Sequence, residues 1–161
     1  MATATDAVRE HLIRALDWDE AHVNFDKALA GLPPERRGAR AAGFAHSAWQ
    51  LVEHIRLAQA DILDFCVNAQ YVHTMTWPDD YWPVDPAPPN DEAWRESLAA
   101  YARDLEALKR LTREQTDLAA TVPTGRDNQT YLRSILLVID HTAHHVGQLI
   151  ALRRALGVWK A

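Results

Sequence analysis

Residues 127–157 have the sequence DNQTYLRSILLVIDHTAHHVGQLIALRRALG, and this stretch decides the fold class. Its apolar residues recur every three or four positions, the spacing that places side chains on one face of an α-helix. Those residues are Leu132, Ile135, Leu136, Ile139, Ala143, Val146 and Ile150. Gly157 follows the pattern and can adopt the left-handed conformation that ends many helices. The stretch therefore predicts one long helix that begins after Asp127-Asn-Gln-Thr130.

Three other segments repeat this helical spacing and are separated by clusters of Gly and Pro. They cover about residues 5–30, 47–68 and 90–117. Ser47 and Gln50 have the spacing of a capping box at the start of the second segment, and Asn90 or Asp91 can cap the third. No stretch shows the strict alternation of apolar and polar residues that is typical of a β-strand. The sequence therefore predicts an all-α four-helix bundle, in a single domain that spans residues 1–161.

Two apolar lines compete for the buried face of the segment at residues 5–30. One line holds Val8, Leu12, Leu16 and Val23, and the other holds Ala15, Trp18, Phe25 and Leu29. His22 falls on the second line. We therefore expect His22 to point into the functional pocket or to lie at its edge.

The connection between the second and third segments, at about residues 67–89, exceeds the roughly 2–8 residues that usually join helices in a bundle. It is rich in proline and contains the string Trp77-Pro-Asp-Asp-Tyr-Trp-Pro83. Loops of this length often form lids or binding walls, so Trp77, Tyr81 and Trp82 are candidates for contacts with a cofactor or substrate. The alternative is that these rings only cover an open end of the bundle.

Composition and charge exclude several classes of protein. The 161 residues include 17 Lys+Arg against 22 Asp+Glu, and a formal charge of −5 makes nucleic-acid binding a poor hypothesis. No run approaches the roughly 18–20 apolar residues of a membrane span, and Met1–Asp6 lacks the basic and apolar regions of a targeting signal. We therefore expect a cytoplasmic protein that does not bind membranes. Cys66 is the single cysteine, which excludes an intrachain disulfide and a zinc ribbon.

Histidines are the most informative residues of the chain. His141 and His145 stand four positions apart, so on a helix both can point toward one ion. Their apolar neighbours Val138 and Leu152 place this face toward the bundle interior. In the second segment, His54 lies on an apolar line and also faces inward. Three imidazoles from two helices predict a metal site with open coordination positions, as in catalytic rather than structural zinc sites.

Other interpretations of these residues stay open. An inward histidine is often a core residue, and a pair of histidines four positions apart occurs by chance on many helices. Thr142 stands where a zincin metalloprotease carries glutamate, so that class is excluded. His144 is expected to flank the site, and Gln148 could hydrogen-bond a ligand histidine or a metal-bound water. Glu53 and Asp140 point away from the proposed ligands and are expected to be solvated.

Three motifs occur together along the chain. They are His46-Ser-Ala-Trp-Gln-Leu-Val-Glu-His54, the Trp77–Pro83 string, and Asp140-His-Thr-Ala-His-His-Val-Gly-Gln148. Their combination resembles the DinB-like family of damage-inducible, metal-dependent enzymes over nearly the whole chain. The resemblance implies a homodimeric four-helix bundle in an up-down-down-up arrangement, with zinc or nickel bound by His54, His141 and His145. His144 stands where many relatives carry tyrosine, which leaves an alternative ligand or a changed pocket wall open.

The resemblance also implies a function. Characterised relatives include transferases that use low-molecular-weight thiols such as bacillithiol or mycothiol, and a mycothiol-dependent maleylpyruvate isomerase. We therefore expect an enzyme that activates such a thiol on a three-histidine metal site for attack on an electrophilic small molecule. The alternatives are a metal-dependent hydrolase and a non-enzymatic dimeric protein that binds a metal or a small molecule. The residues do not identify the metal, since three imidazoles accept zinc, nickel, copper or iron.

Overall fold

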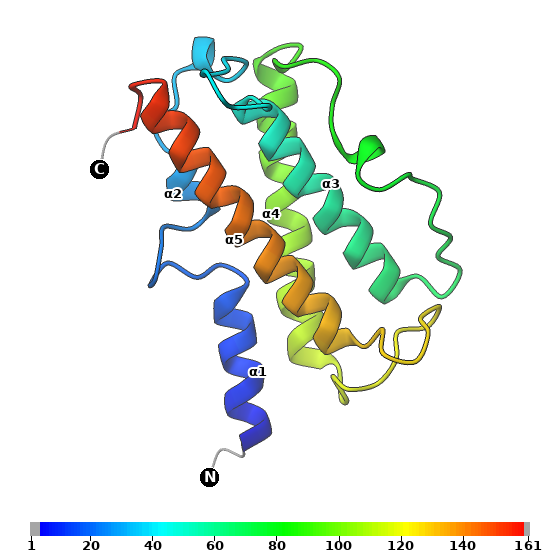
Figure 1. Cartoon of the computed structure of the whole chain (residues 1–161). Helices are drawn as coiled ribbons and strands as arrows, with labels where there is room; N and C mark the ends of the chain where they lie inside the picture. The colour runs from blue at the N-terminus through cyan, green and yellow to red at the C-terminus, as the bar shows by residue number, and fades with distance from the viewer. Residues whose placement is uncertain (1–3, 160–161) are drawn as a thin grey trace.

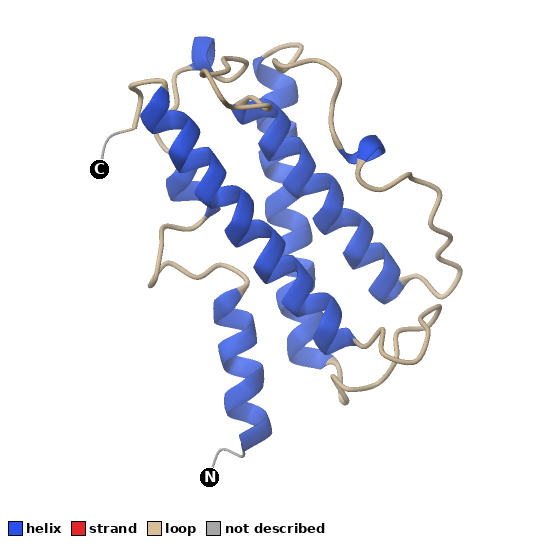
Figure 2. Cartoon of the chain, viewed as in Figure 1, coloured by secondary structure: helices blue, strands red, loops and turns tan. Residues whose placement is uncertain are grey.

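The computed structural model describes residues 4–159, and over this range the chain is helical, with no β-strand (Figure 2). Its four long helices are α1 Ala4–Ala15, α3 Ala48–Val67, α4 Asp91–Glu114 and α5 Tyr131–Ala155. One short helix, α2 Phe25–Leu29, and two single 3-10 turns, η1 Pro34–Arg36 and η2 Asp79–Tyr81, lie in the connections. The prediction of an all-α fold is confirmed.

The long helices run up, down, down and up in chain order (Figure 1). Because α3 and α4 run in the same direction, the chain between them must return along the length of α3. The 20 residues of α3 rise about 30 Å, and residues 68–90 cover that distance as a loop beside α3 (Figure 1). The length of this connection therefore follows from the topology, and its return path brings η2 against the side of α3. We call residues 68–90 the return loop.

Polar side chains and a glycine mark the helix ends. Ser47 Oγ accepts a hydrogen bond from the backbone N–H of Gln50, and the side chain of Gln50 accepts one from the N–H of Ser47, each at 3.2 Å. This is the predicted capping box. Asn90 caps α4 and Thr130 caps α5, each through a side-chain oxygen. Beyond α5, Gly157 has a φ of +70°, the left-handed conformation that glycine adopts without strain.

The prediction of one helix over residues 5–30 is wrong. α1 ends at Ala15, and a loop leads from there to α2. Asn24 caps α2, and its side-chain amide donates to Asp17 Oδ1 at 3.0 Å, which ties the two ends of the loop together. The break resolves the competition between the two apolar lines, because Leu12 enters the core from α1 while Phe25 enters it from α2. One straight helix could have buried only one of the two lines.

α5 forms contacts with all four other helices and contributes Ile135, Val138 and Leu149 to the buried core. By length and composition alone it is also apolar enough to cross a membrane, with a mean hydropathy of 1.3 over its most apolar window. This is weak evidence for a span, because a core helix of a bundle passes the same test.

Candidate metal centre

The three histidines predicted as metal ligands lie together between α3 and α5. His54 comes from α3, and His141 and His145 come from successive turns of α5. The Nε2 atom of His141 is 2.9 Å from Nε2 of His54 and 3.1 Å from Nε2 of His145. His54 and His145 are buried and His141 is half-buried. One ligand atom from each ring lies within 4.8 Å of the others, so the three rings could hold one ion.

Hydrogen bonds on the far side of two rings fix the positions of their protons. Nδ1 of His54 is 3.2 Å from the carbonyl oxygen of Tyr81, which can only accept, so this Nδ1 carries the proton. Nδ1 of His145 donates in the same way to Oε1 of Gln148 at 2.8 Å. Both Nε2 atoms therefore turn lone pairs toward His141. A single N–H of His141 can donate to only one of these two lone pairs. The other lone pair then has no proton to accept, and a bound cation could pair with it.

The donor set suits a divalent transition metal. Imidazole nitrogen is a common ligand of zinc, nickel, copper and iron, and ligand histidines usually donate their other N–H to a carbonyl or similar acceptor. His54 and His145 both do so here. Within residues 4–159, no aspartate, glutamate or cysteine joins the three histidines as a further ligand. An ion held by these three rings alone would have a coordination position open to a substrate atom.

Burial keeps these imidazoles neutral. It lowers the pKa of His54 to about 4 and that of His141 to about 3, and the neighbouring imidazole of His145 adds to both effects. Burial also lowers the pKa of His145. Since the neutral ring is the form that binds metals, the cluster can accept a cation at neutral pH without first losing protons.

Trp82, a candidate binding residue in the sequence, contacts the centre directly. Its ring stacks on His54 with centroids 3.7 Å apart and on His46 at the same distance. Tyr81, the residue before it, supplies the carbonyl group that accepts from His54. The return loop therefore holds His54 in two ways, by stacking and by a hydrogen bond. Sequence reasoning assigned no role to His46, although this residue begins the motif that ends at His54.

A pocket of about 520 Å³ lies beside His141. The return loop provides one wall through Trp77, Tyr81 and His73, and α5 provides another that includes His144. The ring of Trp77 is 5.9 Å from that of His141, centroid to centroid. The aromatic residues of the loop therefore line a cavity next to the candidate centre, as a binding wall would.

A hydrogen-bonded network anchors this wall to α3. Asp61 accepts from the hydroxyl of Tyr71 at 2.8 Å through Oδ1 and from the hydroxyl of Tyr81 at 2.7 Å through Oδ2. Burial and this carboxylate raise the pKa of both tyrosines, so both hydroxyls stay protonated. Nε2 of His73 lies 3.0 Å from the hydroxyl oxygen of Tyr81. Sequence reasoning missed Asp61, Tyr71 and His73, and only the position of Asp61 seven residues after His54, on the same face of α3, could have suggested one of them.

The side chain of Gln148 contacts both His144 and His145. Its Oε1 accepts from His145, and its Nε2 lies 3.1 Å from Nε2 of His144, which it reaches as a donor. His144 is exposed, and its Nε2 is engaged by this contact rather than turned toward His54 and His141. Gln148 thus occupies the position expected of a residue that orients a ligand, and His144 flanks the centre.

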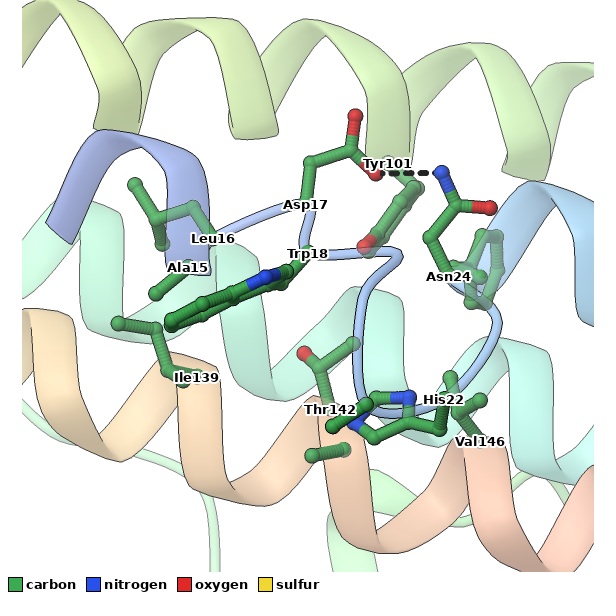
Figure 3. Close-up of a pocket in the computed structure, with 13 residues that line it drawn as sticks. Ala15, Leu16, Asp17, Trp18, His22, Asn24, Tyr101, Ile139, Thr142 and Val146 are labelled. Carbon is green, nitrogen blue, oxygen red and sulfur yellow. Dashed lines mark hydrogen bonds between the residues drawn. The ribbon is translucent and has the colours of Figure 1, made fainter. Parts of the chain in front are cut away.

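The structure does not bring His22 to the three histidines. It is exposed on the loop between α1 and α2, where its Nδ1 is 2.9 Å from the carbonyl oxygen of Val23. Figure 3 shows its ring beside Thr142 and Val146, in a second pocket of about 140 Å³ that Trp18 also lines. None of the three converging histidines lines that second pocket.

One of the two acidic neighbours expected in solvent is instead paired. Glu53 accepts two hydrogen bonds from the guanidinium of Arg56, each at 2.8 Å, and a third from the hydroxyl of Ser97 on α4. It joins α3 to α4, so the expectation of a solvated Glu53 is wrong. Asp140 is exposed, as expected, and lies at the edge of the 520 Å³ pocket.

Comparison with known families adds an independent observation. The family model described as Mycothiol-S-transferase matches residues 11–157 of the chain. This range includes the three histidines and the whole return loop. A search of curated proteins finds no match.

Proposed function

The chain belongs to the mycothiol S-transferase family, a DinB-like family, and from this we propose that it transfers mycothiol or a closely related thiol to an electrophilic small molecule. One observation carries the proposal beyond the family match. Three Nε2 atoms converge with too few protons to pair their lone pairs, and His141, one of the three residues, lines a pocket large enough for a small substrate.

We further propose that His54, His141 and His145 bind one divalent ion, zinc or nickel. Such an ion would supply a positive charge that favours the thiolate form of a bound thiol at neutral pH. Support comes from the neutral state of the three imidazoles and from the outward N–H groups of His54 and His145, which leave their Nε2 lone pairs free for the ion.

The residues around the centre would orient the proposed metal ligands and bind the substrate. Tyr81 accepts a hydrogen bond from His54, and Gln148 accepts one from His145. The ring of Trp82 stacks on His54 and fixes the plane of that imidazole. Trp77 and the apolar residues of the pocket offer an apolar surface beside the position proposed for the reacting sulfur. In the transfer, sulfur forms a bond to the electrophilic carbon while the leaving group departs with the electron pair of the broken bond.

Metal content and thiol transfer test the proposal together. We expect about one zinc or nickel ion per chain by plasma mass spectrometry, as for a single three-histidine site. The loaded protein should conjugate mycothiol to an activated aryl halide, with the thioether detected by mass spectrometry. His145→Ala should lose both the ion and the activity, whereas the matched control His144→Ala should keep the ion. Wild-type protein that takes up no ion from zinc or nickel solutions contradicts the metal site.

The same assay separates transfer from hydrolysis. Metal-dependent turnover of esters or amides without any thiol would support the hydrolase alternative instead. Tight binding of mycothiol without turnover of any electrophile would support a binding protein.

A further inference from the structure

His73 lines the same pocket as His141, and the function proposed above gives it no role. It comes from the return loop, whereas His141 comes from α5, so the two imidazoles enter the pocket from different walls. His73 is exposed, and its Nε2 lies 3.0 Å from the hydroxyl oxygen of Tyr81.

The tautomer of His73 follows from its partner. The hydroxyl of Tyr81 has one proton, and it donates this proton to Asp61 at 2.7 Å. Toward His73 the oxygen of Tyr81 can therefore only accept, so the Nε2 atom of His73, 3.0 Å away, carries the donated proton. The neutral ring then has its lone pair on Nδ1. An aspartate that fixes a histidine tautomer, here through a tyrosine, leaves the other nitrogen free to take a proton.

Charged and titratable groups of both signs line the pockets that His73 lines. They are Asp61 from α3, Tyr71 and Tyr81 from the return loop, and Arg133, Asp140 and His144 from α5. Asp61 is linked to the ring of His73 through the hydroxyl of Tyr81.

We propose that His73 is the general base of the transfer and accepts the proton of the thiol at Nδ1; this rests on the proposed function. The S–H bond breaks, its electron pair stays on sulfur, and the proton forms an N–H bond that makes His73 an imidazolium. Sulfur then forms the bond to carbon as the leaving group departs with its electron pair. The imidazolium returns its proton to the leaving group or to water, so the ring ends neutral.

The first test locates the proton of His73 and needs no electrophile. In protein labelled with ¹⁵N-histidine and loaded with zinc, nitrogen–proton correlation spectra should show the neutral ring of His73 protonated at Nε2. Addition of mycothiol should then shift the Nδ1 signal of His73, because the thiol lies beside that nitrogen. The exposed His11 on α1 serves as the internal reference, because its signals should not change. A neutral ring protonated at Nδ1, or an Nδ1 signal that mycothiol does not shift, overturns the proposal.

The second test uses His73→Gln. The amide nitrogen of glutamine can replace Nε2 as the donor to Tyr81, so the variant keeps the network but has no base. We expect kcat/KM for mycothiol conjugation to fall about 10- to 100-fold at pH 7, the lower part of the range for a general base. The deficit should shrink as the pH rises, because the thiol then ionises without a base. A free thiol does so at about pH 8.5, and the ion proposed above would lower that value. His11→Gln should match the wild type at every pH.

The outcomes separate this inference from the function on which it rests. If wild-type protein conjugates mycothiol and His73→Gln has the same pH profile with normal metal content, His73 is not the base. If loaded wild-type protein does not conjugate mycothiol while the thiol still shifts the Nδ1 signal of His73, the contact between His73 and the thiol stands and the assignment as a transferase fails.

Discussion

His54 and Trp82 stack face to face, with ring centroids 3.7 Å apart and an interplanar angle of 4°. The carbonyl group of Tyr81, one residue earlier, accepts the hydrogen bond from Nδ1 of the same imidazole. Two consecutive residues of the return loop therefore fix both the plane of the His54 ring and its rotation within that plane. Such support would order His54 before the proposed ion binds, which would lower the entropy cost of binding.

Replacing Trp82 by leucine removes the stacking partner and should weaken zinc binding. Outer partners of ligand histidines typically contribute 10- to 100-fold to metal affinity, and we expect a loss of about 10-fold because the Tyr81 hydrogen bond remains. A zinc titration against a competing chelator measures this loss. Trp77→Leu is the matched control, since Trp77 is exposed and its ring only tilts against His54 at 5.6 Å. Equal effects of the two substitutions would show that stacking on His54 contributes nothing.

Gln148 should tune the affinity of the centre through His145. In Gln148→Ala the Nδ1–H of His145 loses its acceptor, and we expect zinc to bind about 10- to 100-fold more weakly. Gln148→Glu offers a carboxylate to the same N–H, which raises the basicity of the ring, so zinc should bind at least as tightly as in the wild type. The chelator competition measures both variants. Weaker binding in the glutamate variant than in the alanine variant would contradict this role.

The stability of the metal-free protein should depend on pH through its buried imidazoles. The folded-state pKa of His54 is about 4 and that of His141 about 3, whereas unfolded histidines titrate near 6.5. Between pH 6.5 and about pH 4, the histidines bind protons in the unfolded state but stay neutral in the folded state. The free energy of unfolding is therefore highest above pH 6.5 and should fall as the pH drops toward 4, by at most about 1.4 kcal/mol per pH unit for each histidine.

Urea unfolding at pH 7 and pH 5, with a chelator present, measures this fall. His141→Asn removes one of the two groups and should reduce the difference between the two pH values. An unchanged difference in the variant would show that His141 titrates normally in the folded protein.

Local patterns were enough to predict the helices of the bundle and the three histidines. Helical spacing shows which residues share a face, so His141 and His145 could be paired, and His54 could be placed on an inward line. The capping box at Ser47 is equally local. The loop between α1 and α2 was missed because each of two apolar lines was consistent with one helix. Only packing against the other helices shows that part of each line is buried.

The surroundings of the centre could not be predicted in this way. The contacts of Trp82 with His46 and His54, and those of Asp61 with the tyrosines of the return loop, join residues far apart in sequence. They depend on the path of residues 68–90 along α3, which no local pattern encodes. Glu53 shows the same limit, because its position on α3 predicted solvent where Ser97 of α4 lies.

Arg153 is a buried cation that does not line the 520 Å³ pocket. Arg153 on α5 is 2% exposed, and its guanidinium donates to the carbonyl groups of Ala28, Ala30 and Val158. These bonds hold α2 and the chain beyond α5 against the bundle. Arg153→Met keeps much of the side-chain volume but leaves these acceptors without their donor. We expect the free energy of unfolding to fall by about 2–4 kcal/mol, with metal content per folded chain unchanged.

Urea unfolding compares Arg153→Met with Arg154→Met, a matched control at the next position. Arg154 is exposed, so its replacement should change the free energy of unfolding by no more than about 0.5 kcal/mol. Similar losses in both variants would mean that the carbonyl contacts of Arg153 do not stabilise the fold. A large loss in Arg153→Met alone would show that the helix that carries two of the candidate ligands also anchors α2, the short helix that sequence spacing had merged with α1.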